Sequence, residues 1–271
     1  MIALPYLSAI RFSGTDAGDF LHNQVSADVL ALSTGESIYA CYCEPKGRVL
    51  ALMLISKVDN DYYVILSDAL ADSIAGRLKM YVMRSNVDIE VLAEQALAGL
   101  FEGDSSDQGG SSTTFIPLPE SGQQLAVVSR ARSPGHDTKQ SGAWKLSELQ
   151  RGVCWLDPET SGQFLPQMLG FDQLGAVNFR KGCYPGQEIV ARTHYLGKVK
   201  RHPRLLNCKL TVCPDRMDKI RLMDGHQAFD AIVVDCESGE DGVICLMVVT
   251  RMEPEQVARQ VEYQGNTADI Y

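Results

Sequence analysis

The sequence predicts an α+β fold that ends in a β-rich C-terminal part. Strand-like and helix-like segments alternate through the first half of the chain, whereas only short β-like runs follow Pro203. The chain has 271 residues, of which 45% are hydrophobic, so that two or three small domains can each bury a core.

The first elements that we expect are a strand and a helix. Leu7 to Phe12 has the composition of a strand, and Thr15 or Asp16 can cap the free amides of a following helix. Phe20, Leu21 and Val25 would then share one face of this helix.

A hairpin and a second helix follow. Ile38 to Cys43 and Arg48 to Ser56 are typical of strands, and Glu44-Pro45-Lys46-Gly47 between them is a turn signal. Tyr62 to Leu66 predicts a third strand. Apolar residues at i, i+4 and i+8 then indicate an amphipathic helix that ends near Met80, before a returning strand. These residues are Leu70, Ile74 and Leu78, and the returning strand is Val87 to Val91.

The middle of the chain contains a segment with almost nothing to bury. Glu102 to Thr114 is rich in Ser, Gly, Asp and Thr, which predicts a flexible surface connection and a domain edge. Beyond it we expect a buried strand at Leu125 to Ser129, a helix at Trp144 to Gln150 and a short apolar element at Leu165 to Leu169. Five short runs after Pro203 indicate a small barrel or sandwich. They are Leu205 to Val212, Lys219 to Met223, Ala228 to Val234, Val243 to Val249 and Val257 to Tyr263.

Several protein classes are disfavoured by composition. Met1 to Ile10 lacks the basic region of a signal peptide, and no later stretch is apolar enough to cross a bilayer. We therefore expect a soluble, cytoplasmic protein with no membrane contact. Eight cysteines are dilute in a chain of this length, so most should be free thiols in a reducing compartment. Their spacings lack a zinc pattern, and we expect no metal site.

Positive charge is concentrated in one strip of an acidic protein. The formal charge is −9, but Asn178 to Arg204 holds seven Lys or Arg against one acid, a local charge of +6 beside −15 elsewhere. The overall charge argues against nonspecific binding of nucleic acid by the whole surface. The strip indicates either an anionic ligand or partner, or a solvated face.

The candidate chemistry lies at the start of this strip, in Lys181-Gly182-Cys183-Tyr184-Pro185-Gly186-Gln187-Glu188. Two glycines and a proline enforce a tight, irregular backbone, so Cys183 should be accessible. Nearby Lys181, Arg180 and Arg192 would favour its thiolate, which is the nucleophilic form. Alternatively, Cys183 is a small buried apolar residue, which is the commonest state of a free cysteine.

This segment resembles the signature Lys-Gly-Cys-Tyr-x-Gly-Gln-Glu of the YgfZ family. The flanks agree, with Phe164 to Met168 before the signature and Val190 to Arg192 after it. The N-terminal half is similar to the wider aminomethyltransferase superfamily. The matching residues there are Asp16-Ala17, Phe20-Leu21, Asp28-Val29, Pro45 to Arg48 and Tyr81 to Ser85.

The resemblance implies three small domains in a ring, with tetrahydrofolate or a one-carbon derivative near the centre and a C-terminal β-barrel. We expect a discontinuous folate-binding domain (residues 1–30 and 115–197), an inserted α+β domain (31–114) and the barrel (198–271). The resemblance also implies support of iron-sulfur enzymes or assembly proteins, including enzymes that thiolate tRNA. The candidate catalytic residues are Cys183 and Lys181, and the candidate folate-binding residues are Tyr184, Gln187, Glu188 and Arg192.

One departure from the superfamily bears on the reaction. Where the aminomethyltransferase carries an Asp-Asp pair, this chain has Ala51 and Leu52, which cannot orient or protonate an amine. We therefore do not expect glycine cleavage. Three hypotheses remain: a folate-binding accessory factor, a one-carbon transferase with Cys183 as nucleophile, and a tRNA-contact module that uses the basic strip 180–204.

The roles of Glu188 and Arg192 have two interpretations. Glu188 is the only acid of the strip, so it could accept the paired donors of a pterin or orient Arg192. Alternatively, the two form an ion pair at i, i+4 spacing, which contributes only about 0.3 to 0.5 kcal/mol when exposed.

Overall fold

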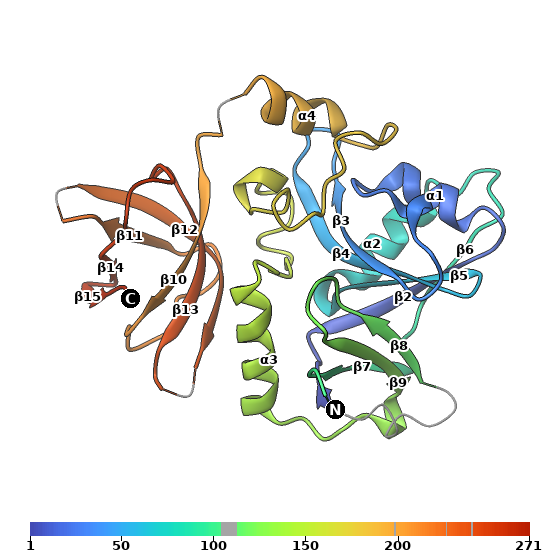
Figure 1. Cartoon of the computed structure of the whole chain (residues 1–271), viewed down its shortest axis with the longest axis horizontal. Coiled ribbons are helices and arrows are strands. Elements are labelled where there is room, and N and C mark those ends of the chain that lie inside the picture. The colour runs from blue at the N-terminus through green and yellow to red at the C-terminus, as the bar shows by residue number, and fades with distance from the viewer. Residues whose placement is uncertain (104–112, 198, 226, 240) are drawn as a thin grey trace.

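The computed structural model describes residues 1–103, 113–197, 199–225, 227–239 and 241–271. Most of the surface connection expected at Glu102 to Thr114 lies outside the described residues, and so does Lys198 of the basic strip. Three antiparallel sheets make up the architecture (Figure 1).

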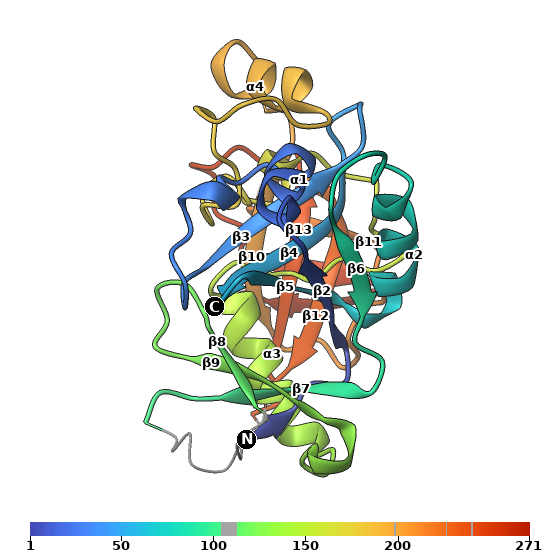
Figure 2. The ribbon, with the colours of Figure 1, turned by 90° about the vertical axis from the view of Figure 1, so that its right-hand side faces the viewer.

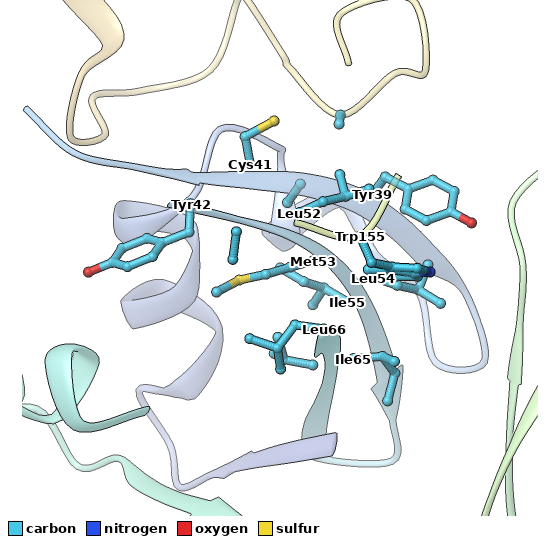
Figure 3. Packing of buried hydrophobic residues seen from close by; sticks show 14 of the residues in the cluster. Tyr39, Cys41, Tyr42, Leu52, Met53, Leu54, Ile55, Ile65, Leu66 and Trp155 are labelled. Carbon is cyan, nitrogen blue, oxygen red and sulfur yellow. The ribbon is translucent and has the colours of Figure 1, made fainter. Parts of the chain in front are cut away.

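The first sheet has five strands in the order β3-β4-β5-β2-β6. Its strands are β2 (Leu7–Ser13), β3 (Ser37–Cys43), β4 (Val49–Val58), β5 (Asp61–Ser67) and β6 (Asp88–Val91). The predicted hairpin is confirmed, because β3 pairs with β4 across residues 44–47 and the Gly47 N–H donates to the Glu44 carbonyl at 2.8 Å. Figure 3 shows how side chains of β3, β4 and β5 pack together beside this hairpin.

Two helices and a 3-10 turn accompany this sheet: α1 (Ala17–Gln24), α2 (Asp68–Lys79) and η1 (Val29–Ala31). The apolar face predicted for α2 is confirmed, since Leu70, Ile74 and Leu78 are all buried. The side-chain cap predicted for α1 is wrong. Asp16 occupies the N-cap position without capping, and its carboxylate instead accepts from the Asn86 N–H at 2.7 Å.

The second sheet has four strands in the order β1-β7-β9-β8. They are β1 (Ile2–Ala3), β7 (Gln95–Leu100), β8 (Thr114–Pro117) and β9 (Gln124–Ser129). After the short η3 (Arg130–Arg132), α3 (Thr138–Gln150) begins six residues before the predicted start, with Asp137 capping the Lys139 and Gln140 amides. Trp144 of α3 packs on Gly99 of β7, where an added Cβ would lie 2.6 Å from the indole ring.

The third sheet contains the C-terminal strands in the order β10-β13-β12-β11-β14-β15. It curls so strongly that its two ends meet, because Cys208 and Ile270 form a bridge and the Tyr271 N–H donates to the Asn207 carbonyl at 3.0 Å. It also has its own apolar core. The strands are β10 (His202–Cys208), β11 (Lys219–Met223), β12 (Ala228–Ser238), β13 (Ile244–Thr250), β14 (Gln260–Tyr263) and β15 (Asn266–Asp269).

The strands group differently from the predicted domain boundaries. β2 pairs with β5 and β6, and β1 pairs with β7, so sheet pairing crosses the boundary expected after residue 30. Sheet membership alone does not define domains, and the boundaries and the ring stay predictions.

A central region joins the three sheets. α3 and the segment after it, which includes η4 (Pro166–Met168), lie between the C-terminal sheet and the two N-terminal sheets (Figures 1 and 2). α4 (Gln187–Tyr195) lies beyond the turn of the β3-β4 hairpin (Figure 1). Among the described residues, no helix combines the length and the apolar character that a membrane span requires.

Candidate functional site

The cysteine loop, which we define as residues 178–186, is docked on the end of α1. The Asn178 N–H donates to the Ser26 carbonyl at 2.9 Å, and the Ser26 hydroxyl donates to the Ala176 carbonyl at 2.5 Å. The Asn178 side-chain oxygen accepts from the backbone amides of Arg180 and Lys181 at 2.8 and 3.1 Å. These hydrogen bonds tie the start of the cysteine loop to Ser26, which closely follows α1.

Lys181 is a buried anchor of this loop. Its ammonium group donates to the backbone carbonyls of His22 and of Val25, the latter at 2.6 Å, both at the C-terminal end of α1. Such carbonyls lack partners within the helix and favour a cation. Burial lowers the Lys181 pKa to about 8, against the opposing effects of Asp28 and Cys183. The catalytic role predicted for Lys181 stays a prediction, because the structure shows the amino group engaged with backbone.

The end of the loop rests on the β3-β4 hairpin. Gly186, the N-cap residue of α4, has a φ of 85°, and a Cβ there would approach the Glu44 carbonyl oxygen to 2.5 Å. Only glycine fits this combination of left-handed backbone and close contact. The Gln187 side chain donates to the Lys181 carbonyl at 3.3 Å, and Tyr184 is buried. The structure thus brings together two segments that the sequence analysis singled out separately, the hairpin turn and the signature.

Cys183 is the exposed thiol on this support. The other five free cysteines are buried, and burial raises the thiol pKa of each of them. They are Cys41, Cys43, Cys154, Cys208 and Cys245. The accessibility predicted for Cys183 is therefore confirmed. The remaining two cysteines, Cys213 and Cys236, form a disulfide with Cα atoms 6.0 Å apart and are the exceptions to the prediction that most thiols are free.

His22 and Asp28 are polar neighbours of the loop that sequence reasoning did not select. His22 Nδ1 lies 3.3 Å from an Asp28 carboxylate oxygen. His22 Nε2 lies 4.0 Å from the position that a Cβ on Gly182 would occupy, next to Cys183. Burial and the Lys181 charge lower the His22 pKa, with Asp28 opposing them, so the imidazole is neutral near pH 7. The sequence carries no signal for this arrangement, because His22 and the signature are far apart in the chain and come together only in the folded protein.

Glu188 and Arg192 of α4 face solvent. They form an ion pair at 3.0 Å, with side chains 78% and 63% exposed. Of the two sequence interpretations, the i, i+4 pair is the one formed in the structure. A folate contact of these residues stays a prediction.

A pocket of about 340 Å³ lies beside the start of β3. Tyr39, Arg151 and Glu120 are among its lining residues. Within the described part of the chain, the buried Tyr39 hydroxyl and one buried Arg151 Nη have no hydrogen-bond partner. A second pocket of about 400 Å³ shares Glu120, Arg151 and Leu174 with the first. Buried polar groups without partners are expensive, so these atoms are suited to a polar ligand.

The interior next to this pocket holds a buried carboxylate. Glu148 is 1% exposed and accepts from the Tyr6 hydroxyl at 2.8 Å and from the Trp155 indole at 3.0 Å. Burial raises its pKa to about 7 despite these bonds. The ring centroids of Tyr39 and Trp155 lie 6.4 Å apart. Figure 3 shows both side chains. Ala51 and Leu52 of β4 are buried and supply no carboxylate.

Comparisons with known proteins agree on the fold and the relatives. No protein-family model matches the chain. A tRNA-modifying protein YgfZ of Yersinia pestis (strain Pestoides F) is 30% identical over 229 residues, which cover 74% of this chain and 68% of the relative. Its counterpart in Klebsiella pneumoniae (strain 342) is 27% identical over 282 residues, covering 94% and 86%. The glycine cleavage system aminomethyltransferase T of Bartonella henselae has the same fold, with a TM-score of 0.71 and 14% identity over 99% of this chain and 83% of that one.

Proposed function

This chain belongs to the YgfZ family, and from this premise we propose that it binds tetrahydrofolate or a one-carbon derivative and supports tRNA modification through the cysteine loop. The clients would be iron-sulfur enzymes or their assembly proteins, including enzymes that thiolate tRNA. The observation that carries the proposal is the contrast between one exposed thiol on an anchored loop and five buried thiols.

The support of the loop favours a chemical role for Cys183. A flexible surface loop needs neither a buried lysine on two carbonyls nor a glycine pressed onto a hairpin. Both features cost conformational freedom or desolvation, which is typical of sites whose geometry must be held.

Folate fits the Tyr39 pocket chemically. A pterin presents a carbonyl acceptor and paired N–H donors, and the pocket offers the Tyr39 and Arg151 donors together with the Glu120 carboxylate. The second pocket, of about 400 Å³, could hold the part of the folate beyond its pterin. The placement predicted from sequence, through Tyr184, Gln187, Glu188 and Arg192, is the competing one.

The reaction class differs from that of the aminomethyltransferase. Without a carboxylate at Ala51 or Leu52, the chain lacks the acidic pair for amine chemistry, so an accessory role is the better supported one. A one-carbon transferase is the second candidate, in which His22, beside Gly182, would serve as the base that this mechanism needs. The Cys183 thiol would transfer its proton to Nε2 of the neutral His22, directly or through one water, and Asp28 would stabilise the resulting imidazolium.

Calorimetric titration with tetrahydrofolate tests the folate site. We expect Tyr39→Phe and Arg151→Met each to weaken binding by roughly tenfold, since each removes one hydrogen bond to the ligand. Glu188→Gln should bind as the wild type does. If Glu188→Gln and Arg192→Ala lose binding while the pocket variants retain it, folate lies at α4. If wild-type protein binds no folate derivative, the folate part of the proposal is wrong.

Thiol labelling and tRNA analysis test the role of the loop. At limiting iodoacetamide, Cys183 should be alkylated before every other thiol, and His22→Gln should slow its labelling near pH 7. In cells that lack this protein, the wild type should restore thiolated tRNA nucleosides and Cys183→Ala should not. Cys245→Ser serves as the matched control, because that thiol is buried. Full restoration by Cys183→Ala would refute the proposed role.

A further inference from the structure

Aromatic side chains gather on the surface next to the cysteine loop. The rings of Phe179 and His194 stack at 3.7 Å with an interplanar angle of 15°. The Tyr195 ring meets the His194 ring edge-on at 4.8 Å. Tyr195 is 62% exposed, and the adjacent Leu196 is 86% exposed. We call Phe179, His194 and Tyr195 the stacking surface. Exposed aromatic rings held in a fixed geometry indicate a site of contact with a partner.

The chain that leaves the stacking surface reaches a basic pocket on the C-terminal sheet. From α4 the chain passes through Lys200 and Arg201 to β10. Arg201 then lines a pocket of about 520 Å³ together with Lys219, Arg251 and Phe229. Asp230 is the only acid among the lining residues. In Figure 1, α4 lies above the C-terminal sheet, whose strands β11, β12 and β13 carry most of the residues that line this pocket.

The distribution of charge indicates what kind of partner this surface binds. The protein carries −9 overall, which opposes a nonspecific polyanion site across the whole surface. Three cations around one pocket and an arginine on each side of the cysteine, Arg180 and Arg192, make this strip the exception. Cations that hold phosphates beside aromatic faces that stack on bases are the combination that binds single-stranded nucleic acid.

We propose that the stacking surface and the basic pocket form one binding track for a single-stranded RNA segment. Bases would stack on His194 and Tyr195, and phosphates would contact Arg201, Lys219 and Arg251. This inference rests on the proposed function in tRNA modification, and it identifies the surface that would bind the RNA substrate. Because Phe179 is part of the cysteine loop, the track presents the RNA beside Cys183.

The binding test uses fluorescence anisotropy with an unmodified tRNA transcript and a labelled single-stranded RNA of about 12 nucleotides, a length on the scale of single-strand sites. Tyr195→Ala should weaken binding roughly five- to hundredfold, the range measured for the loss of one stacked base. The double variant Arg201→Gln/Arg251→Gln should weaken it and flatten the dependence of log K on log salt by about 1.4, which is two phosphates on a single strand.

Two matched variants serve as controls. Arg132→Gln removes an exposed arginine from η3, at the opposite end of the molecule from α4 (Figure 1), and Tyr271→Ala removes an exposed tyrosine from the C-terminus. Both should bind RNA as the wild type does. If the track variants bind as tightly as these controls, or if wild-type protein shows no salt-dependent RNA binding, the track is refuted. Capture of an acidic protein that depends on the same residues, without RNA binding, would also refute it.

The failures of the two proposals can be told apart in cells. If the track variants restore tRNA thiolation fully while Cys183→Ala does not, the track is wrong and the proposed function stands. If Cys183→Ala restores thiolation while RNA binding still depends on Tyr195, the role of the cysteine is wrong and the track stands.

Discussion

Two regions of this protein bury charge in opposite ways. Lys181 and Glu148 are each buried without an ion-pair partner in the described structure and are satisfied by neutral groups. Between α3 and the C-terminal sheet, by contrast, Arg216 binds both Asp235 and Asp157, at 3.0 and 2.9 Å, while Lys145 binds Asp235 at 2.9 Å. We call these four residues the ion cluster.

The pKa shifts favour the neutral forms of Lys181 and Glu148, but they favour the charged forms of Lys145 and Arg216 in the ion cluster. Burial lowers the Lys181 pKa to about 8 and raises that of Glu148 to about 7, so both move toward the neutral form. Burial also opposes the charges of Lys145 and Arg216, but the facing carboxylates, Asp235 foremost, outweigh it and raise both pKa values. Lone buried charges are therefore sensitive to pH near neutrality, whereas the ion cluster is not, and only the lone charges lie beside the candidate sites.

The largest effect should come from breaking the ion cluster. Arg216→Met removes the cation that binds both Asp235 and Asp157 and leaves the buried Asp235 with Lys145 alone, so the free energy of unfolding should fall by about 3 to 5 kcal/mol. Urea unfolding measures this. Arg221→Met is the control, because its 3.7 Å pair with Glu262 is largely exposed and should contribute less than about 1 kcal/mol. Equal losses of unfolding free energy in the two variants would show that the buried ion cluster contributes no more to stability than an exposed ion pair.

The second effect concerns Glu148 and its pH dependence. Its folded-state pKa of about 7 lies above the ordinary value of 4.5, so the folded state holds a proton that the unfolded state releases. Stability from this group is present below pH 4.5 and is lost as pH rises to 7, by roughly 3 kcal/mol at most. Glu148→Gln should flatten this slope in unfolding curves between pH 5 and 8. An unchanged slope would mean that another group titrates.

The third effect concerns the anchor of the cysteine loop. Lys181→Met leaves the His22 and Val25 carbonyls without a donor, which should cost about 1 to 3 kcal/mol of stability. The exposed neighbour Arg180→Met is the control and should change stability by less than about 0.5 kcal/mol. Hydrogen exchange of the residue 178–186 amides should rise in Lys181→Met alone. If both variants behave as the wild type, Lys181 does not anchor the loop.

The smallest effect should come from the exposed pair on α4. Glu188→Gln removes an i, i+4 pair whose side chains face water, so the free energy of unfolding should change by at most about 0.5 kcal/mol. Thermal unfolding at low and high salt checks this, since salt should erase what difference there is. A loss above 1 kcal/mol would contradict this, because an exposed pair alone does not contribute that much to the free energy of unfolding.

Local patterns in the sequence determined the elements and the accessibility of the cysteine. The β3-β4 turn, the buried face of α2 and the irregular glycine-rich loop around Cys183 follow from turn residues and apolar spacing among close neighbours. The resemblance of residues 181–188 to the family signature predicted the family and the aminomethyltransferase-like fold. The predicted cap of α1 is wrong because Asp16 contacts Asn86 instead. The start of α3 does carry a local signal, the Asp137 cap, which the prediction did not use.

Only the tertiary structure decided what surrounds the cysteine and where charge is buried. Lys181 meets residues of α1 that lie more than 150 positions earlier, His22 meets Asp28 beside Gly182, and Cys213 pairs with Cys236. Arg216 finds its carboxylates on β12 and in the segment after α3. No local pattern specifies these partners, because packing of the sheets against α3 chooses which distant side chains meet. Burial at those places then sets their protonation.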